Sequence, residues 1–512
     1  MMYIHNSGKN HSLYHGNRNI QGEDTSTRRL YPGCVILCAY LCVLAAFMFD
    51  SSQRTSFFRP AAIILVTLIL IGVYWYRRKK LTVGRIILLI FAASFIIKLC
   101  YVLYVPINAE EADMQHDFGE FYNGSGHAGY IQWFYENGLK LIDQDPRTLY
   151  QFYHPPLHHF IAALWVHMQT ITGLGYERAI AGVQFLTLFY SCSCTFVAER
   201  IFRKIGLKRS GLVIATAVIA FHPTFVILSG SINNDILSIL FIFLAVYATI
   251  CWYQNPTTKN IIWIALSFGL GMMTKLSMAV LALPIALVFI IKWFKEKKIW
   301  KRYLKQYCLF LAISAPLSLW YSVRNLVKFG VPLGYVPSDS VQSDQYIGNY
   351  SLFERLFDFS DHPFRSIFLN RGADGTEHNI IVAILKTSLF GEWNLGGSFT
   401  SKIVPLCWIA LVLNIILIGI ALFAMVFFLI KKNRFLDGVM KLFLGGYYVL
   451  LMVQYVVFCI RYPFTCSMDF RYIVPTLLIG SLFIGILAEH IESIRGGSPR
   501  SIRDGKTKRA KV

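Results

Sequence analysis

Long apolar stretches separated by short polar turns make up most of the chain. A helix needs about 20 apolar residues to cross the hydrocarbon core of a bilayer, so this pattern predicts a series of membrane-spanning helices. The candidate spans are 32–49, 57–76, 84–105, 178–199, 210–228, 235–253, 260–274, 276–292, 306–323, 401–430, 439–460 and 472–490. We therefore predict an all-α polytopic membrane protein with about 12 transmembrane helices and juxtamembrane helices on its outer face.

Short basic clusters between the apolar stretches set the predicted orientation. They are Arg28–Arg29, Arg77–Lys80, Arg200–Arg209, Lys292–Lys305, Lys431–Arg434 and the tail after Arg495. If the N-terminus is cytoplasmic and the spans alternate, every cluster falls on the cytoplasmic side, as the positive-inside rule requires. The long polar loops 106–177 and 324–400 then lie outside, and they hold most of the 28 acidic residues. Both termini are expected in the cytoplasm.

Three segments follow from this arrangement: a polar N-terminal segment (1–31), a transmembrane domain (32–490) and a basic tail (491–512). Residues 155–172 are apolar enough to suggest a further span, but a crossing there would invert every later basic cluster. We expect this segment to lie on the outer face as an interfacial helix. Histidines in or beside it suit an interface better than a hydrocarbon centre: His154, His158, His159 and His167.

Composition agrees with a membrane protein. The 512 residues are 55% hydrophobic and 15% charged, with a mean hydropathy of +0.50, which excludes an ordinary soluble protein. The net charge of +21 would suit nucleic acid, but the basic residues lie between spans. We therefore expect membrane lipids, and no nucleic acid, as partners.

The polar segment Asn108–His159 carries eight carboxylates and only two basic side chains. Within it, Asp117 lies between His116 and a glycine, and a carboxylate in such a loop could take a proton from an incoming hydroxyl. A solvated loop acid is the simpler alternative. Three other acids are reserve candidates if the loop folds differently: Glu110, Glu111 and Asp113.

The end of this segment combines histidines with a double proline. Because proline suits the first turn of a helix, Pro155 and Pro156 predict a helix start there. The free amides and positive dipole end of a helix N-terminus attract anions. His154 would lie at that end, with His158 as a supporting group. The alternative is a proline-capped amphipathic helix with histidines at headgroup level.

Three later positions place charge at the outer ends of predicted spans. Asp235 follows Gly230–Asn234, which holds more polar residues than a helix cap requires, although capping alone is the alternative. Lys275 lies in a tight turn between two short spans and needs a partner. Arg471 stands where the last span leaves the outer surface. Acids and cations on one face suit transfer of a group from a lipid phosphate.

Taken in order, these motifs resemble those of the GT-C glycosyltransferases, near the protein O-mannosyltransferases and the bacterial aminoarabinose transferases of lipid A (glycosyltransferase family 39). Residues 84–330 carry the resemblance best. The matching positions are Asp117, His154–Leu157, Asp235, Thr274–Lys275 and Arg471–Pro475. The chain departs from the family pattern because no Glu follows Asp117, and because His154 stands where some members have a lysine.

The resemblance implies a polyprenyl-phosphate-linked sugar donor, an acceptor hydroxyl on a glycan, lipid or protein, and inversion at the anomeric carbon. It favours the bacterial plasma membrane. On this hypothesis Asp117 is the general base. The donor phosphate would be bound by His154, Lys275 and Arg471. Supporting groups, or ligands of a divalent cation such as Mg²⁺ or Mn²⁺, would be Asp235, Glu111, Asp113, His116 and His158.

A transporter or lipid flippase is the alternative from another class. Transporters place ionisable groups near mid-membrane and show internal repeats, whereas these spans have few central charges and no evident repeat. A non-catalytic assembly subunit is a third hypothesis, under which Asp117 would be dispensable. The sequence identifies neither the sugar nor the acceptor.

Overall fold

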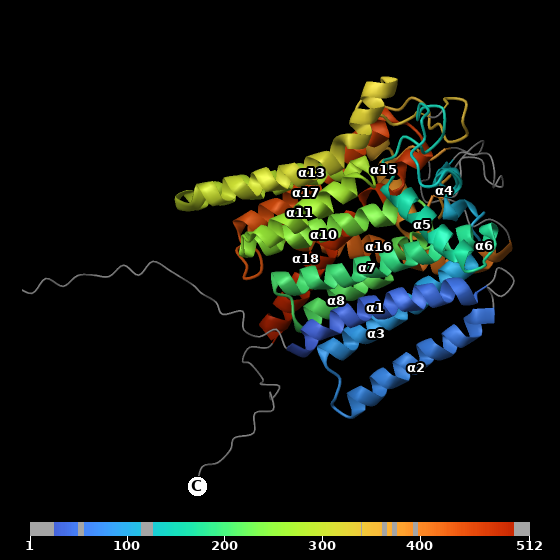
Figure 1. Ribbon diagram of the computed structural model, residues 1–512. Coiled ribbons are helices and arrows are strands. Elements are labelled where there is room, and N and C mark those ends of the chain that lie inside the picture. Colours follow the sequence, from blue (N-terminus) through green and yellow to red (C-terminus); the bar gives the residue numbers. More distant parts are fainter. Residues whose placement is uncertain are drawn as a thin grey trace, which may run out of the picture.

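The fold is a bundle of long helices with shorter helices gathered at one end (Figure 1). The computed structural model describes residues 25–49, 56–113, 126–338, 340–360, 366–370, 376–392 and 398–495. The helices of the bundle are α1 (Thr25–Met48), α2 (Phe58–Arg77), α3 (Val83–Tyr104), α7 (Val183–Ile205), α8 (Arg209–Phe221), α10 (Asp235–Gln254), α11 (Thr258–Met272), α12 (Ala282–Lys295), α13 (Trp300–Phe329), α16 (Ser398–Ile430), α17 (Gly438–Arg461) and α18 (Pro475–Arg495).

Shorter elements connect the long helices. The short α-helices are α4 (Gly126–Glu136), α5 (Leu157–Ile171), α6 (Tyr176–Ala181), α9 (Pro223–Ile227), α14 (Leu352–Phe357) and α15 (Ile380–Phe390). The 3-10 turns are η2 (Glu110–Ala112), η3 (Leu276–Leu281), η4 (Lys297–Ile299), η5 (Thr465–Met468) and η6 (Phe470–Ile473). Across the described ranges, the one β-type pairing is an isolated bridge between Tyr346 and Phe464.

The prediction of an all-α polytopic membrane protein is confirmed. Nine helical segments of the described residues are long and apolar enough to cross a membrane. Each of the twelve predicted spans overlaps a helix or a broken helix. Two of them match apolar segments that are shorter than a span, 32–48 and 209–221, so the predicted number of about 12 crossings is not confirmed. The predicted span 210–228 is broken because Pro223 starts α9 after α8 has ended at Phe221.

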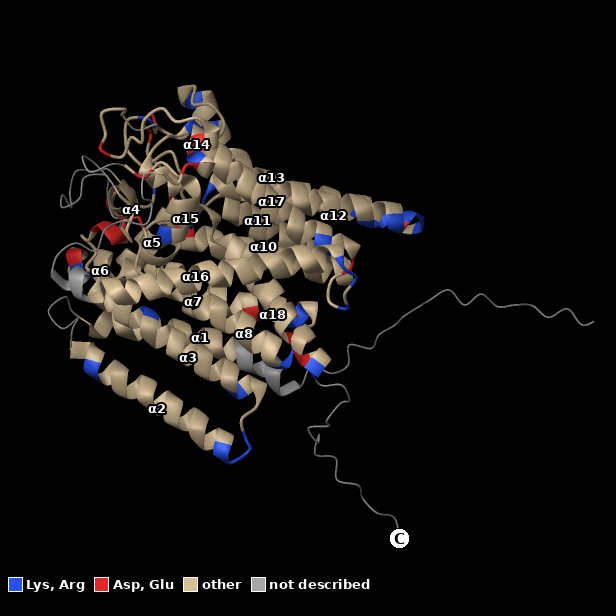
Figure 2. Cartoon of the chain, turned by 180° about the vertical axis from the view of Figure 1, so that it is seen from behind, with Lys and Arg blue, Asp and Glu red and all other residues tan. Residues whose placement is uncertain are grey.

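Charge is distributed unequally between the two ends of the bundle. Figure 2 shows acidic residues around α4, α5 and α15, and dense Lys and Arg at the far end beyond α12. This separation is the one that the sequence pattern predicts for outer and cytoplasmic ends.

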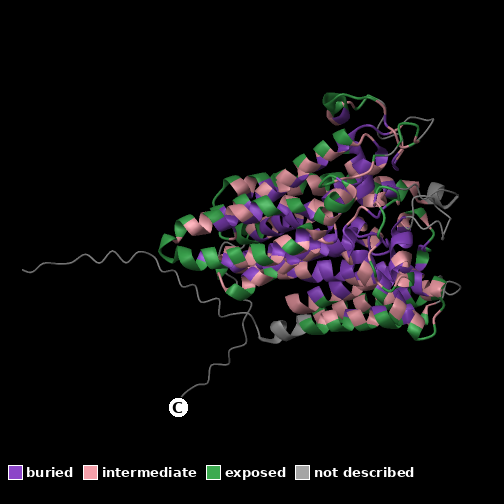
Figure 3. Cartoon of the chain, turned by 45° about the horizontal axis from the view of Figure 1, so that its top comes forward, coloured by how far each residue is buried: buried purple, intermediate pink, exposed green. Residues whose placement is uncertain are grey.

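Burial is concentrated in the middle of the bundle (Figure 3). In the apolar window of α10, 72% of residues are buried inside the protein, against 6% for α2, which packs mainly on α3. An apolar surface as exposed as that of α2 suits contact with lipid. The buried helix α10 therefore begins at the acidic end, so the residues at its start are held by the protein interior.

The predicted interfacial segment 155–172 contains α5 (Leu157–Ile171), which lies with α4 and α6 at the acidic end, as expected for a segment that does not cross (Figure 1). Ile171 is 83% exposed, whereas His158 and His159 are fully buried. These two histidines are thus enclosed by protein, which removes the alternative in which they lie at headgroup level. His159 is covered by α4, where its ring stacks on Tyr130, whereas His158 faces the Ile232 carbonyl oxygen and the Tyr190 ring.

Candidate functional site

Backbone and side-chain hydrogen bonds bring distant segments together at the acidic end. The Ile232 amide donates to the Ala112 carbonyl oxygen at 2.9 Å, which joins η2 to the segment before α10. The Leu157 amide donates to the Met273 carbonyl oxygen at 3.0 Å, which joins α5 to the end of α11. These bonds position the start of α10 between the first outer loop and the turn that carries Lys275.

Asp113 ends η2 in a left-handed backbone conformation, with φ of 53°, which is uncommon outside glycine. Its Oδ2 atom accepts a hydrogen bond from Asn233 Nδ2 at 2.8 Å and one from Arg471 Nη1 at 3.0 Å. The Nε2 atom of His127 lies 3.9 Å from the same oxygen. No hydrogen bond or ion pair to Oδ1 is found in the described part of the chain.

Arg471, in η6, stands at the centre of a group of acids. Besides Asp113, its guanidinium lies 3.2 Å from a Glu392 oxygen and 4.0 Å from an Asp235 oxygen. Its backbone amide donates to Asp469 Oδ1 at 2.6 Å. Three carboxylates thus face the guanidinium, which a planar group with five donors can accommodate, and the fourth, that of Asp469, is bound by the backbone amide.

Lys275 provides the second cation of the cluster. Its ammonium forms an ion pair with Asp235 Oδ1, and it lies 4.9 Å from the centroid of the Tyr472 ring. The Asp235 amide in turn donates to Asn233 Oδ1 at 3.0 Å. Asn233 therefore holds both the start of α10 and the Asp113 carboxylate, which fixes the spacing between the two acids.

Burial and charge shift the pKa values of two of these acids in opposite directions. Burial would raise the pKa of Asp113, but the charge of Arg471, with His127 and the Asn233 hydrogen bond, holds it below its usual value. Burial raises the pKa of Asp469 to about 7, against the lowering effect of Arg471, and the negative charge of Glu392 adds to the rise. At neutral pH Asp113 is ionised, while Asp469 is close to half protonated.

A small cavity opens beside these groups. Its volume is about 30 Å³, room for one or two waters. It is lined by Glu110, Glu111, Asp113, Thr224, Ile227, Leu228, Ser231, Asn233, Thr387, Gly391, Glu392, Asp469 and Arg471. A sugar does not fit this volume, so a ligand would have to separate the surrounding segments.

Histidines from α4, from α5 and from the turn before α5 lie near Asp113. His127 Nδ1 lies 2.9 Å from His159 Nε2, and the His154 ring stacks on the other side of His127 with centroids 5.9 Å apart. His158 instead points its Nε2 at the Ile232 carbonyl oxygen, 2.8 Å away. Burial lowers the pKa of His127 to about 4 although Asp113 raises it, so the ring is neutral at neutral pH.

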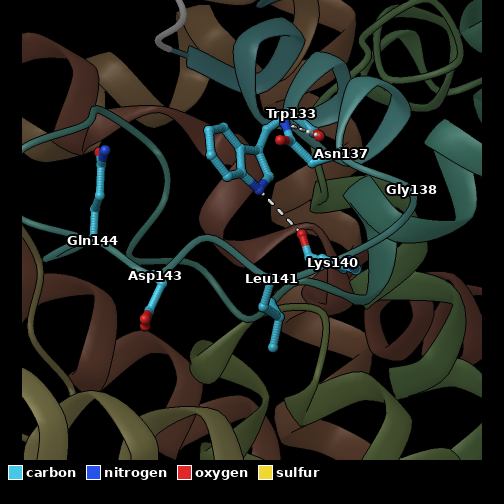
Figure 4. Close-up of a pocket in the computed structure, with 7 residues that line it drawn as sticks. All are labelled: Trp133, Asn137, Gly138, Lys140, Leu141, Asp143 and Gln144. Atoms are coloured by element: carbon cyan, nitrogen blue, oxygen red, sulfur yellow. Dashed lines mark hydrogen bonds between the residues drawn. The ribbon is translucent and has the colours of Figure 1, made fainter.

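A wider hollow of about 570 Å³ lies at the other end of α4. Figure 4 shows its lining: Trp133, Asn137, Gly138, Lys140, Leu141, Asp143 and Gln144. The Trp133 indole donates to the Lys140 carbonyl oxygen at 3.0 Å, which fixes the ring. Its acid, Asp143, forms an ion pair with Lys328. None of the residues predicted for the site lines it.

The structure brings together most of the predicted site residues that it describes. Asp113, Asp235, Lys275 and Arg471 form one cluster. Glu111 lines the cavity, and His154 reaches the cluster through His127. His158 faces a backbone carbonyl instead. The predicted base Asp117 and its neighbour His116 lie outside the described residues.

Sequence reasoning missed three members of the cluster: His127, Glu392 and Asp469. A usable signal existed for Asp469, an acid two residues before Arg471 in an otherwise apolar region. No comparable pattern marks His127 or Glu392, whose relevance depends on which segments meet.

The described donors do not fit a divalent cation as they stand. Among the described residues, no group of three or more His, Cys, Asp or Glu side chains could hold a metal ion. The carboxylates of Asp113 and Asp235 already face Arg471 and Lys275, and a cation would have to displace these partners. We therefore assign no metal-dependent step to these residues.

A buried ion pair supports the segment that carries Glu392. Lys386 Nζ lies 2.9 Å from Glu377 Oε2, and the lysine is fully buried. We expect Lys386→Met to cost about 3 kcal/mol in free energy of unfolding because it leaves a buried charge unpaired. Denaturant unfolding of the detergent-solubilised protein measures the loss, and the double variant Lys386→Met/Glu377→Gln should recover much of it.

The exposed pair of Lys328 and Asp143 provides the matched control. Lys328→Met removes a lysine of the same length from a solvated pair and should cost less than about 1 kcal/mol. Equal losses for Lys386→Met and Lys328→Met would contradict the role given to the buried pair.

Comparison with known proteins finds a similarity to one family over part of the chain. Residues 153–320 match the family described as dolichyl-phosphate-mannose-protein mannosyltransferase. The matched segment, 153–320, includes Asn233, Asp235 and Lys275, but neither Asp113 nor Arg471. The match confirms the resemblance to membrane glycosyltransferases of the GT-C type that the motifs predict.

Curated protein sequences and solved structures were the other two comparisons. No curated protein sequence matches the chain. Among solved structures, the chain is similar to ArnT from Cupriavidus metallidurans in the apo state, with 15% sequence identity and a TM-score of 0.33. That similarity covers 75% of this chain and 76% of the other.

Proposed function

We propose that the protein is an integral membrane glycosyltransferase that moves a sugar from a polyprenyl-phosphate-linked donor to an acceptor hydroxyl at the outer face of a bacterial plasma membrane. Its termini would be cytoplasmic. The observation that carries the proposal is the cluster at the acidic end, where Arg471 and Lys275 lie beside the ionised Asp113. The family match over 153–320 supports the reaction class.

In the proposed reaction, the acceptor oxygen attacks the anomeric carbon and the carbon–oxygen bond to phosphate breaks. The electron pair of that bond leaves with the phosphate, and the proton of the acceptor hydroxyl goes to a carboxylate, with inversion at the sugar. Asp113 is suited to this role, because two hydrogen bonds go to Oδ2, with His127 Nε2 3.9 Å from the same oxygen, and none to Oδ1 is found among the described residues. Asp117 remains the sequence-based candidate for the same step.

The departing phosphate would be stabilised by cations. Arg471 offers a planar fork that matches phosphate oxygens, and Lys275 adds a point charge. Both are held in advance by carboxylates, so a bound phosphate would replace acids as their partner. His154, half-buried beside His127, would adjoin the phosphate as a neutral group, because burial lowers its pKa well below the usual value.

The proton on Asp469 should control donor binding. A sugar linked through a phosphodiester carries one negative charge, and it must enter beside Asp469, whose pKa is about 7. Below that pH the carboxyl is neutral and repulsion is smaller, so affinity should fall as pH rises through 7, by up to about fivefold between pH 7 and 8. Asp469→Asn is neutral throughout and should lose this dependence.

The donor KM measured between pH 6 and 8.5 tests the role of Asp469. Asp344→Asn, at an exposed position of the outer loop, is the matched control and should keep the wild-type profile. An unchanged profile in Asp469→Asn would show that this carboxyl does not sense the donor.

Identifying the donor tests the function itself. In a strain that lacks the protein, the lipid-linked sugar that it consumes should accumulate, and mass spectrometry of extracted lipids would identify it. Restoring the wild-type chain should remove the excess. If no sugar-bearing polyprenyl phosphate accumulates and none is consumed on restoration, the proposed function is wrong.

A transporter or flippase remains the alternative, and Lys98 is the observation on its side. This lysine is fully buried in α3, where Nζ donates to the Ser191 carbonyl oxygen at 3.2 Å and to Thr195 Oγ1 at 3.3 Å. A buried intramembrane charge often marks a transport path. A transporter would move the lipid-linked sugar across the bilayer without cleaving it, so detection of free polyprenyl phosphate separates the two functions.

A further inference from the structure

The two ring nitrogens of His127 face different partners. Nε2 lies 3.9 Å from Asp113 Oδ2, while Nδ1 lies 2.9 Å from His159 Nε2. The His159 ring is itself fixed by stacking on Tyr130, with centroids 4.3 Å apart. His159, His127 and Asp113 therefore form a row. It starts in the buried packing between α4 and α5 and ends at the Asp113 carboxylate.

Hydrogen-bond accounting selects one protonation pattern for this row. If His127 carried its proton on Nδ1, His159 would have to carry its own on Nδ1, which is buried and has no partner. The bare Nε2 of His127 would then also face a carboxylate. If His127 carries its proton on Nε2, His159 donates to Nδ1 and the carboxylate faces a donor. A buried N–H without a partner is the more costly outcome, so the second pattern is favoured.

We propose that His159 and His127 are positioning residues for Asp113: His159 fixes the tautomer of His127, and the Nε2–H dipole of His127, 3.9 Å from Oδ2, favours the orientation of the carboxylate in which Oδ1 faces the acceptor hydroxyl. This inference rests on the proposed function, because it assigns a task to neighbours of the proposed base. Neither histidine touches substrate or exchanges protons with it.

The neutral state of His127 suits this task. Burial keeps its pKa at about 4 despite the nearby Asp113 and Asp235, so the ring can direct its Nε2–H dipole at Asp113 Oδ2, 3.9 Å away, without adding a charge. A second full positive charge beside Arg471 would weaken Asp113 as a base. A neutral donor orients the carboxylate with a smaller effect on its basicity.

Two substitutions of His127 test the roles of its two ring nitrogens separately. Gln places its amide nitrogen near the position of Nε2 and should keep the contact with Asp113, whereas Asn reaches only the position of Nδ1. We expect His127→Asn to lower kcat by about 100-fold, the scale of a misplaced catalytic group, with donor KM little changed. His127→Gln should retain kcat within about threefold of wild type.

The assay uses the purified full-length protein in liposomes and the lipid-linked sugar that accumulates in the deletion strain. His159→Gln keeps a donor near Nε2 and should stay active, while His159→Leu should resemble His127→Asn. His167→Gln is the matched control, since His167 lies on α5 against Tyr135, away from Asp113. Its kcat should equal that of wild type.

Combination with Asp113→Asn decides whether His127 acts through the carboxylate. If it does, His127→Asn should cause no further loss of residual turnover in the Asp113→Asn background. A full 100-fold loss in that background, or equal kcat for His127→Asn and His127→Gln, would overturn the positioning role alone. Full turnover by Asp113→Asn by itself would instead overturn the proposed base, and this inference with it.

Discussion

Asp113→Asn should lower turnover of the lipid-linked sugar by about 10²–10⁴-fold, the usual contribution of a general base. The substitution keeps the size and hydrogen-bonding geometry of the side chain, so the amide oxygen can still accept from Asn233 and Arg471. It removes the charge that receives the proton. The loss should therefore appear in kcat, measured as polyprenyl phosphate released per minute by the protein in liposomes.

Asp117→Asn is the comparison that assigns the base. If Asp113 takes the proton, Asp117→Asn should retain more than about a tenth of wild-type turnover, well above the loss expected for a missing base. The reverse order, with Asp117→Asn inactive and Asp113→Asn active, would move the role to the residue that the sequence motif favours. Thermal unfolding of both variants should match wild type, which separates lost chemistry from lost structure.

Arg471→Gln should lower turnover by about 10³-fold, because it removes the group that meets the charge developing on the phosphate. It also leaves Asp113, Glu392 and Asp469 without their shared cation, so we expect donor affinity to fall as well. Arg471→Lys restores the charge but not the planar fork, and it should recover only part of the loss. Initial rates over a range of donor concentrations would resolve kcat from KM.

Arg461→Gln serves as the matched control for Arg471→Gln. Arg461 is exposed at the end of α17 and contacts the Tyr462 ring, so its removal changes the local charge equally without touching the cluster. Wild-type kinetics are expected. If Arg471→Gln were as active as Arg461→Gln, the cluster could not be the phosphate site.

The helical class and the site differ in how far the sequence could predict them. Runs of about 20 apolar residues mark membrane helices by a local property, so every predicted span coincides with helical structure. Breaks inside spans depend on single residues, as at Pro223. The count of crossings is less certain from sequence because short helices such as α8 fall below the length criterion.

Charged residues at the ends of spans were predictable because a buried charge needs a partner. That argument marked Asp235, Lys275 and Arg471, which the structure joins in one cluster. The partners of these residues could not be predicted from the neighbouring sequence. Asp113 and Arg471 are 358 positions apart. Asp113 was only a reserve candidate for the base, because nothing in the loop sequence distinguishes it from its acidic neighbours. His127 lacked any motif, since its role depends on the packing of α4 against α5.

Release of free polyprenyl phosphate tests the central claim most directly. The purified protein would be reconstituted in liposomes that contain the lipid-linked sugar identified in the deletion strain, and lipids would be followed by mass spectrometry. We predict that wild-type protein converts this lipid to free polyprenyl phosphate in the presence of acceptor, and that Asp113→Asn does so at least about 100-fold more slowly. The account would be contradicted if the sugar lipid stayed intact after prolonged incubation with correctly folded wild-type protein and cell-envelope acceptor.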